Sequence, residues 1–305
     1  IAVGYQALAA LTTGDYNTAV GYGALDALLT GNDNTALGWG AGGSSSNTTG
    51  TNNTLIGSNA GNQIINRNDN TFVGYRVGAT NRAGTAPFSS GQYNVAIGYE
   101  ALKSFTTGEK NTILGYQAGD AVTTGNYNVL LGSDAGGGIT TGGNNVVIGH
   151  QSMDAAAGAA DGMISIGTEA LGTFNGGNVD SSVAVGEYAL NSLTDGTSNV
   201  AVGSFALRYT TGTLNTAIGA SAAYNMTTGD ENVAIGYNAL GVAGAASDNV
   251  AIGSNAGNNA VKTQLSVLVG YNAGQYSTGS YNTFVGGHAG KGGTTSAPYS
   301  SGQYN

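Results

Sequence analysis

Aromatic residues recur directly after a Val/Ile/Leu-Gly pair, and their regular spacing is the feature of this 305-residue chain that most suggests chemistry. A row of exposed flat rings can stack on the apolar faces of sugar rings, which would make it a glycan-contact surface. The same rings can instead stack on one another as a structural ladder. The candidate glycan-contact residues are Tyr22, Trp39, Tyr99, Tyr116, Tyr237 and Tyr271.

Residues that act as nucleophiles, general acids or metal ligands do not cluster in the sequence. The chain has no Cys, and its two histidines, His150 and His288, lie about eight repeats apart. Asp and Glu are scattered, without the paired carboxylates of a glycosidase or the tandem nonapeptides of calcium-binding β-rolls. The sequence therefore predicts no catalytic residue, no metal and no cofactor, and a protein that is not an enzyme.

Thr-Thr-Gly segments also recur, the first at 12–14. Regularly spaced hydroxyls suggest an ice-binding face. Adjacent threonines on a strand point to opposite faces, however, whereas a flat ice plane needs alternate positions. We therefore expect these segments to form turns.

The composition excludes several other classes of protein. Only 8% of residues are charged, Gly contributes 54 residues and Pro two, which is unlike an average globular domain. The 17 Tyr and the many Val and Ile residues argue against disorder. A net charge of −9 argues against a nucleic-acid partner, and the short apolar runs predict no membrane insertion in this segment.

The elements that position the aromatic residues are short repeats, and each contains one repeat glycine. It falls at 4, 21, 38, 57, 74, 98, 115, 132, 149, 167, 186, 203, 219, 236, 253, 270 and 286. The usual step is 17 residues, and 13 of the 16 residues four positions before the glycine are Asn, which excludes chance. We expect the Asn at a turn, bonded to backbone and stacked on its equivalents, and the Gly at a positive-φ bend or close approach. Representative structural repeat residues are Asn17, Gly21, Asn34, Gly38, Asn111, Gly115, Asn232 and Gly236.

The Val/Ile/Thr-rich run before each repeat glycine has the length and composition of a strand. A 17-residue unit is too short for a helix pair, so the sequence predicts an all-β parallel β-solenoid, or β-roll, of about 17 coils. The strands are apolar on both faces, as in Val129–Leu131, which indicates burial on both faces. One face can close on the coil's own interior and the other needs a partner, so we expect a homo-oligomer, most simply a homotrimer.

Residues 1–305 are predicted to form one continuous repeat array. It begins and ends within a repeat, as expected for a section of a longer fibre. The longest inserts between coils are 79–93 and 291–304, which carry Phe88 and Tyr299. Loops on a rigid scaffold often bind ligands, although both inserts can equally be bulges without a function.

The Asn-Thr/Val-Ala-Val/Ile-Gly core resembles the head repeats of trimeric autotransporter adhesins, a haemagglutinin-type motif also met in phage tail fibres. The resemblance covers the whole chain and implies a left-handed parallel β-roll, three associated chains and adhesion to host matrix or cells. The chain departs from the family in its units of about 17 rather than about 14 residues and in its Thr-Thr-Gly and Gly-Tyr-Gln-Ala segments.

These observations together predict an extracellular structural and adhesive fibre, located at a cell surface or on a virion. The expected partners are other copies of the chain and a cell-surface glycan or matrix protein. A bacteriophage tail fibre that binds a host receptor is the first alternative. A self-assembling surface filament without a receptor is the second.

Overall fold

The chain is an all-β parallel β-solenoid, as the repeat predicts. A computed structural model describes residues 1–44, 48–63, 67–79, 90–155, 158–173, 181–260 and 263–292. These residues contain 17 strands, one for each repeat, and none of them is helical. The chain comprises two compact units, Ile1–Ala159 and Ala160–Asn305. Of the predicted inserts, residues 80–89 and 293–304 lie outside the described residues.

Each strand is two or three residues long and ends directly before a repeat glycine. The first unit contains β1 (Ala2–Val3), β2 (Thr18–Val20), β3 (Thr35–Leu37), β4 (Thr54–Ile56), β5 (Thr71–Val73), β6 (Val95–Ile97), β7 (Thr112–Leu114), β8 (Val129–Leu131) and β9 (Val146–Ile148). The second contains β10 (Ile164–Ile166), β11 (Val183–Val185), β12 (Val200–Val202), β13 (Thr216–Ile218), β14 (Val233–Ile235), β15 (Val250–Ile252), β16 (Val267–Val269) and β17 (Thr283–Val285).

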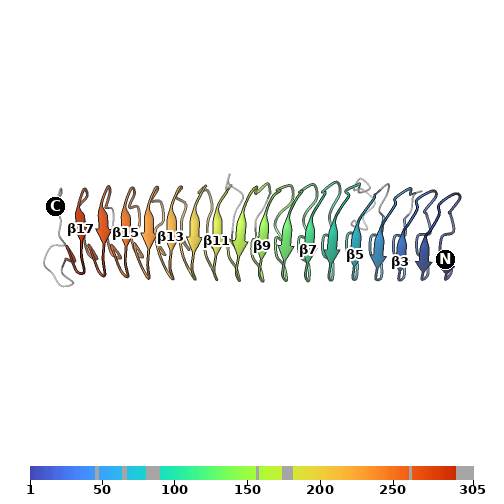
Figure 1. Cartoon of the computed structure of the whole chain (residues 1–305), viewed down its shortest axis with the longest axis horizontal. Coiled ribbons are helices and arrows are strands. Elements are labelled where there is room, and N and C mark those ends of the chain that lie inside the picture. Colours follow the sequence, from blue (N-terminus) through green and yellow to red (C-terminus); the bar gives the residue numbers. More distant parts are fainter. Residues whose placement is uncertain are drawn as a thin grey trace. The chain divides into compact units, whose positions relative to one another are not determined.

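Within each unit, every strand pairs in parallel with the next strand along the chain. Equivalent residues face each other: Ala19 of β2 pairs with Ala36 of β3, and Val129 of β8 with Val146 of β9. Figure 1 shows strands of the first unit, among them β3, β5, β7 and β9, side by side. Each position of the repeat therefore forms a row that runs through successive coils.

The two faces of the strands differ in burial. The middle residue points into the coil and is fully buried in most strands, as at Ala19 and Leu130. The two outer residues point away from the core and are half-buried or exposed; Leu37 is 48% exposed and Leu114 is 49% exposed. One apolar face of each strand thus forms the core, and the other lies on the surface of the chain.

Two rows share the space inside the coil. Six middle strand residues are large, and each has Gly at the fourth position after its repeat glycine; they are Leu55, Phe72, Ile113, Leu130, Leu268 and Phe284. Where the middle residue is Ala or Ser, that fourth position is usually a buried Leu, as in the pair Ala96 and Leu102. A Cβ atom added to Gly78 would lie 2.7 and 2.8 Å from ring atoms of Phe72, too close for carbon atoms. The two rows therefore compensate each other in volume.

The repeated Asn residues form buried hydrogen-bonded ladders. The Oδ1 atom of Asn111 accepts hydrogen bonds from the backbone N–H (2.9 Å) and the side-chain amide (3.1 Å) of Asn128. Its Nδ2 donates to Oδ1 of Asn94 (3.0 Å) and to the carbonyl of Gly125 (2.9 Å). Each Asn thus ties its own coil to both neighbouring coils.

The Asn ladder of the first unit is unbroken through eight coils. Its members are Asn17, Asn34, Asn53, Asn70, Asn94, Asn111, Asn128 and Asn145. In the second unit, Ser182 and Ser266 replace Asn, and their Oγ atoms accept hydrogen bonds from the N–H groups of Asn199 (3.1 Å) and Asn282 (3.2 Å). Serine therefore preserves the bond to the next coil but lacks the amide donor.

The repeat glycine is the point of closest approach between coils. Gly236 has a φ of +125°, and a Cβ atom added to it would lie 2.8 Å from the carbonyl carbon and oxygen of Gly253. Any other residue there would strain the backbone and separate the two coils. Glycine is therefore required by both its conformation and its size.

Asn111→Ala should lower the free energy of unfolding by about 1–3 kcal/mol, because it leaves the carbonyl of Gly125 and the N–H of Asn128 buried without these partners. Asn111→Ser should cost less, because a serine oxygen accepts the equivalent bond at Ser182 and Ser266. Urea unfolding followed by circular dichroism measures both. Equal losses for Ala and Ser would show that the acceptor oxygen is not what stabilises the ladder.

Phe72→Ala should lower the free energy of unfolding by about 3–5 kcal/mol through the cavity it leaves. Gly78→Leu alone should also destabilise the chain, because the new side chain meets the Phe72 ring. The double variant reproduces the Ala96 and Leu102 pair, so it should recover about 1 kcal/mol or more of the summed losses. A double-mutant cycle in urea tests this, and simple additivity would contradict volume compensation.

Candidate functional site

Exposed aromatic rings form two ladders on the first unit. The first ladder consists of Tyr5, Tyr22 and Trp39, and the second of Tyr75, Tyr99 and Tyr116. Successive ring centroids lie 5.1 to 6.4 Å apart, and the ring planes are within 21° of parallel. Ser58 occupies the same row between the two ladders.

The ring spacing limits where a ligand can stack. A flat ligand between two rings needs contacts of roughly 3.5–4 Å on each side, or about 7–8 Å between the rings. The observed ring spacings are all smaller than this, so inside a ladder the face of each ring packs against the next ring and is not open to a ligand. An open ring face remains only where a ladder ends, as at Trp39, where the next coil contributes Ser58.

The other two predicted aromatic residues stand apart from the ladders. Tyr237 and Tyr271 belong to the second unit and are separated in their row by Ser254. The Tyr271 and His288 rings form a T-shaped pair, with centroids 5.2 Å apart. Sequence reasoning missed a further stacked pair, Tyr188 and Phe205 (5.3 Å), which lies one position further along the repeat.

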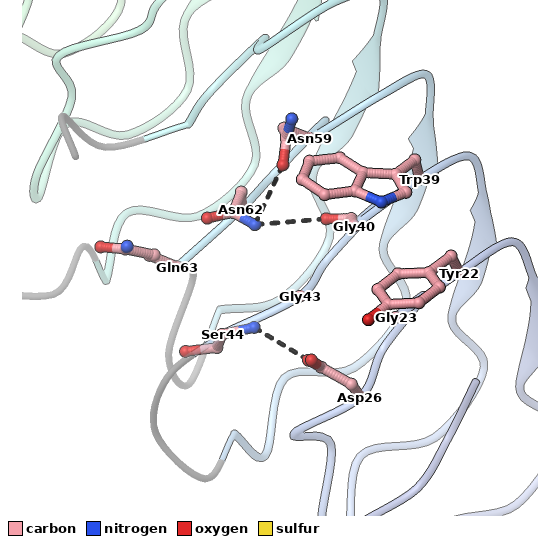
Figure 2. Close-up of a pocket in the computed structure, with 10 residues that line it drawn as sticks. All are labelled: Tyr22, Gly23, Asp26, Trp39, Gly40, Gly43, Ser44, Asn59, Asn62 and Gln63. Atoms are coloured by element: carbon pink, nitrogen blue, oxygen red, sulfur yellow. Dashed lines mark hydrogen bonds between the residues drawn. The ribbon is translucent and has the colours of Figure 1, made fainter. Parts of the chain in front are cut away.

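A groove of about 280 Å³ lies beside the first ladder. Figure 2 shows Tyr22 and Trp39 along one side of it and Asn62, Gln63 and Ser44 along the other. The backbone N–H of Ser44 donates to Oδ1 of Asp26 (3.1 Å). The groove therefore combines aromatic, amide and carboxylate groups, all from three consecutive coils.

The groove is hollow because glycine replaces larger residues there. Gly23 and Gly40 occupy the second position after the repeat glycine in two consecutive coils, and Gly43 lies three residues beyond Gly40. Equivalent positions in the second ladder are occupied by Arg76 and Glu100. In the sequence, the groove is marked by glycine at the same position of two consecutive repeats. A search for reactive residues does not detect this pattern, because glycine has no side chain.

The same region beside the second ladder is filled by charged groups. Glu100 accepts hydrogen bonds from Arg76 (2.7 Å), Lys103 (3.2 Å) and Gln117 (3.2 Å). Lys103 also pairs with Asp120 at 2.9 Å. The Glu100 side chain is only 10% exposed. The network bridges three coils.

The charges in this network shift the pKa values of its members. Burial alone would raise the pKa of Glu100, but hydrogen bonds from Lys103 and Gln117 and the charges of Lys103 and Arg76 hold it below its usual value. Burial alone would lower the pKa of Lys103, but bonding and attraction to Asp120 and Glu100 raise it above its usual value. Both shifts favour the charged forms.

The Thr-Thr-Gly segments lie in bends rather than strands. In several of them the first Thr hydroxyl donates to the backbone of the next coil, as from Thr106 to the carbonyl of Thr123 (3.1 Å) and from Thr123 to that of Thr140 (3.0 Å). These hydroxyls are therefore used within the solenoid.

No three His, Asp or Glu side chains among the described residues come together to hold a metal ion, and His150 and His288 lie in different units. None of these residues belongs to a helix of the length and hydrophobicity that crossing a bilayer requires. No protein-family model matches the sequence, and no curated protein is significantly similar to it.

The Glu100 network should stabilise the fold between about pH 5 and pH 10. Because the pKa of Glu100 is lowered on folding, its contribution is present above the unfolded pKa of about 4.3 and is lost as the pH falls through the folded value. We expect Glu100→Gln to cost about 1 kcal/mol at pH 7, and less below pH 4. Urea unfolding at several pH values measures this difference.

Glu231→Gln is the matched control, because Glu231 is exposed and forms no ion pair with any described residue. Its effect should be close to zero at pH 7. A loss for Glu100→Gln that stays constant from pH 7 to pH 3 would show that packing, not charge, explains the effect.

Proposed function

We propose that this chain is a section of an extracellular adhesive fibre in which copies of the chain associate side by side, most simply as a homotrimer. The observation that carries the proposal is the outer face of the strands, which we call the strand face. It consists of the first and third residues of each strand. Its large apolar members with more than a third of their surface exposed include Leu37, Val95, Ile97, Leu114, Ile218, Ile252 and Val267.

The strand face has the properties of an association surface. Its residues align from coil to coil, so the apolar side chains form a continuous row within each unit rather than isolated patches. Continuous exposed apolar surface of this kind marks interaction sites in soluble proteins. A second copy that covers the row would bury side chains such as Leu114 without any change in the coil.

Adhesion is supported by the exposed aromatic rings and by the groove beside them. Two aromatic ladders repeat chemically similar groups along the first unit, the groove lies beside one of them, and weak contacts multiplied over several sites give strong attachment. The resemblance to adhesin head repeats supports the same function. A phage tail fibre has the same architecture and is the second candidate, and a surface filament without a receptor is the third.

Light scattering on the isolated chain tests the association. The mass should be near three times the 30.0 kDa of one chain. Replacing the seven named members of the strand face together by Thr should reduce it to the mass of one chain, because Thr keeps the strand but removes apolar surface. Thr already occupies the first position of β3 and β7.

Val242→Thr is the control for that variant. Val242 is 42% exposed but lies outside the strands, so the same loss of apolar surface there should leave the mass unaltered. A stable single chain in the unsubstituted protein would contradict the proposed association. Attachment of the assembled chain to cells or matrix-coated surfaces, compared with a smooth globular protein, tests adhesion separately.

A further inference from the structure

The groove beside the first aromatic ladder lies at an interruption of the repeat. Its volume of about 280 Å³ is just below the range typical of sites for drug-sized ligands, so it suits a smaller ligand. One six-membered sugar ring with its hydroxyl groups fits such a space.

The aromatic side of the groove has an open ring face. Trp39 is 50% exposed and ends the ladder, because the next residue in its row is Ser58. The face that a fourth aromatic ring would cover is therefore available to a ligand. The C–H groups on one side of a pyranose ring form an apolar face that matches the indole in size.

The opposite side supplies hydrogen-bonding groups at different heights along the solenoid. Nδ2 of Asn62 lies 3.3 Å from the carbonyl of Gly40 and 3.4 Å from Oδ1 of Asn59, which fixes the two amides relative to each other (Figure 2). Oδ1 of Asp26 accepts the N–H of Ser44. Amide and carboxylate oxygens at fixed positions suit the several hydroxyl donors of a sugar.

The charge of the groove selects among sugars. Asp26 is a carboxylate, and none of the ten described residues that line the groove is Lys, Arg or His. A sugar that carries a carboxylate or sulfate would be repelled and would find no cation to pair with. A neutral sugar would meet no such repulsion, and its hydroxyls would be donors for the oxygen atoms of Asp26, Asn59 and Asn62.

We propose that this groove binds one neutral hexopyranose unit of a glycan. Trp39 and Tyr22 would form the apolar wall, and Asp26, Asn59 and Asn62 would bind the hydroxyl groups. The inference rests on the proposed adhesive function and gives that function a ligand class. A single site of this size should bind with a Kd roughly in the millimolar range, so attachment depends on several chains acting together.

Two variants of the intact chain test the site. Gly23→Gln fills the groove: a Cβ atom at Gly23 has only Oδ2 of Asp26 within 4 Å, at 3.7 Å, and Gln already occupies this position at Gln6 and Gln117. Trp39→Ser removes the ring face, and Ser58 shows that the row accepts Ser. Both changes use residues that the repeat itself contains, so both should keep the fold, which circular dichroism checks.

Tyr16→Ser is the matched control. Tyr16 is 85% exposed outside both ladders and the groove, and Ser181 and Ser198 occupy the same position of the repeat. Saturation-transfer NMR with tetrasaccharides of glucose, galactose and mannose, and with tetragalacturonate, measures binding. We expect transfer to at least one neutral sugar, none to galacturonate, a loss of tenfold or more for Gly23→Gln and Trp39→Ser, and no change for Tyr16→Ser.

Other outcomes overturn the assignment in distinguishable ways. Equal binding of neutral sugars to the unsubstituted chain and to all three variants would exclude the groove as the binding site. It would not contradict the adhesive function. Preference for galacturonate would contradict the charge argument. Absence of sugar binding by a chain that still attaches to cells would also reject the groove alone, whereas absence of both sugar binding and attachment would reject the adhesive function with it.

Discussion

Each coil approaches the next most closely at the repeat glycine, and the rest of the structure is arranged around that contact. At Gly236 there is no room for a Cβ atom against the carbonyl of Gly253. This approach sets the separation of the coils to that of paired strands, so equivalent positions stack in register. The Asn ladder, the aromatic ladders and the core rows all depend on that register, because each needs the same residue type one coil away.

A second constraint is the number of left-handed residues in each coil. Besides the repeat glycine, positive φ recurs five residues before it and two and four residues after it, as at Lys110, Gln117 and Gly119 around Gly115. These bends allow about 17 residues to close one coil. Where the fourth position is Leu, as at Leu102, the left-handed conformation costs about 1–2 kcal/mol, and complete burial of the side chain offsets that cost.

The sequence was sufficient to predict the solenoid, because strand, Asn and Gly recur at fixed offsets and a short repeat allows few other folds. It also predicted that one face of the strands would lie outside the core. It did not reveal the volume compensation between Phe72 and Gly78, because that pattern appears only once both rows are known to share one interior. The groove was not predicted for a related reason. Gly23 and Gly40 create space because they have no side chain, whereas sequence motifs are defined by residues that are present.

The ladders show why function in such a chain is expected at the interruptions of its repeat. A perfect row of Tyr would cover every ring face except the two at its ends, since each ring lies about 5 Å from the next. A row broken by Ser58 exposes an additional face at Trp39. Where oppositely charged residues occupy the second position after the repeat glycine in consecutive coils, as at Arg76 and Glu100, they form ion pairs between coils and neutralise each other. The break at Gly23 and Gly40 leaves space instead, so the regular positions stabilise the solenoid and the exceptions are available for binding.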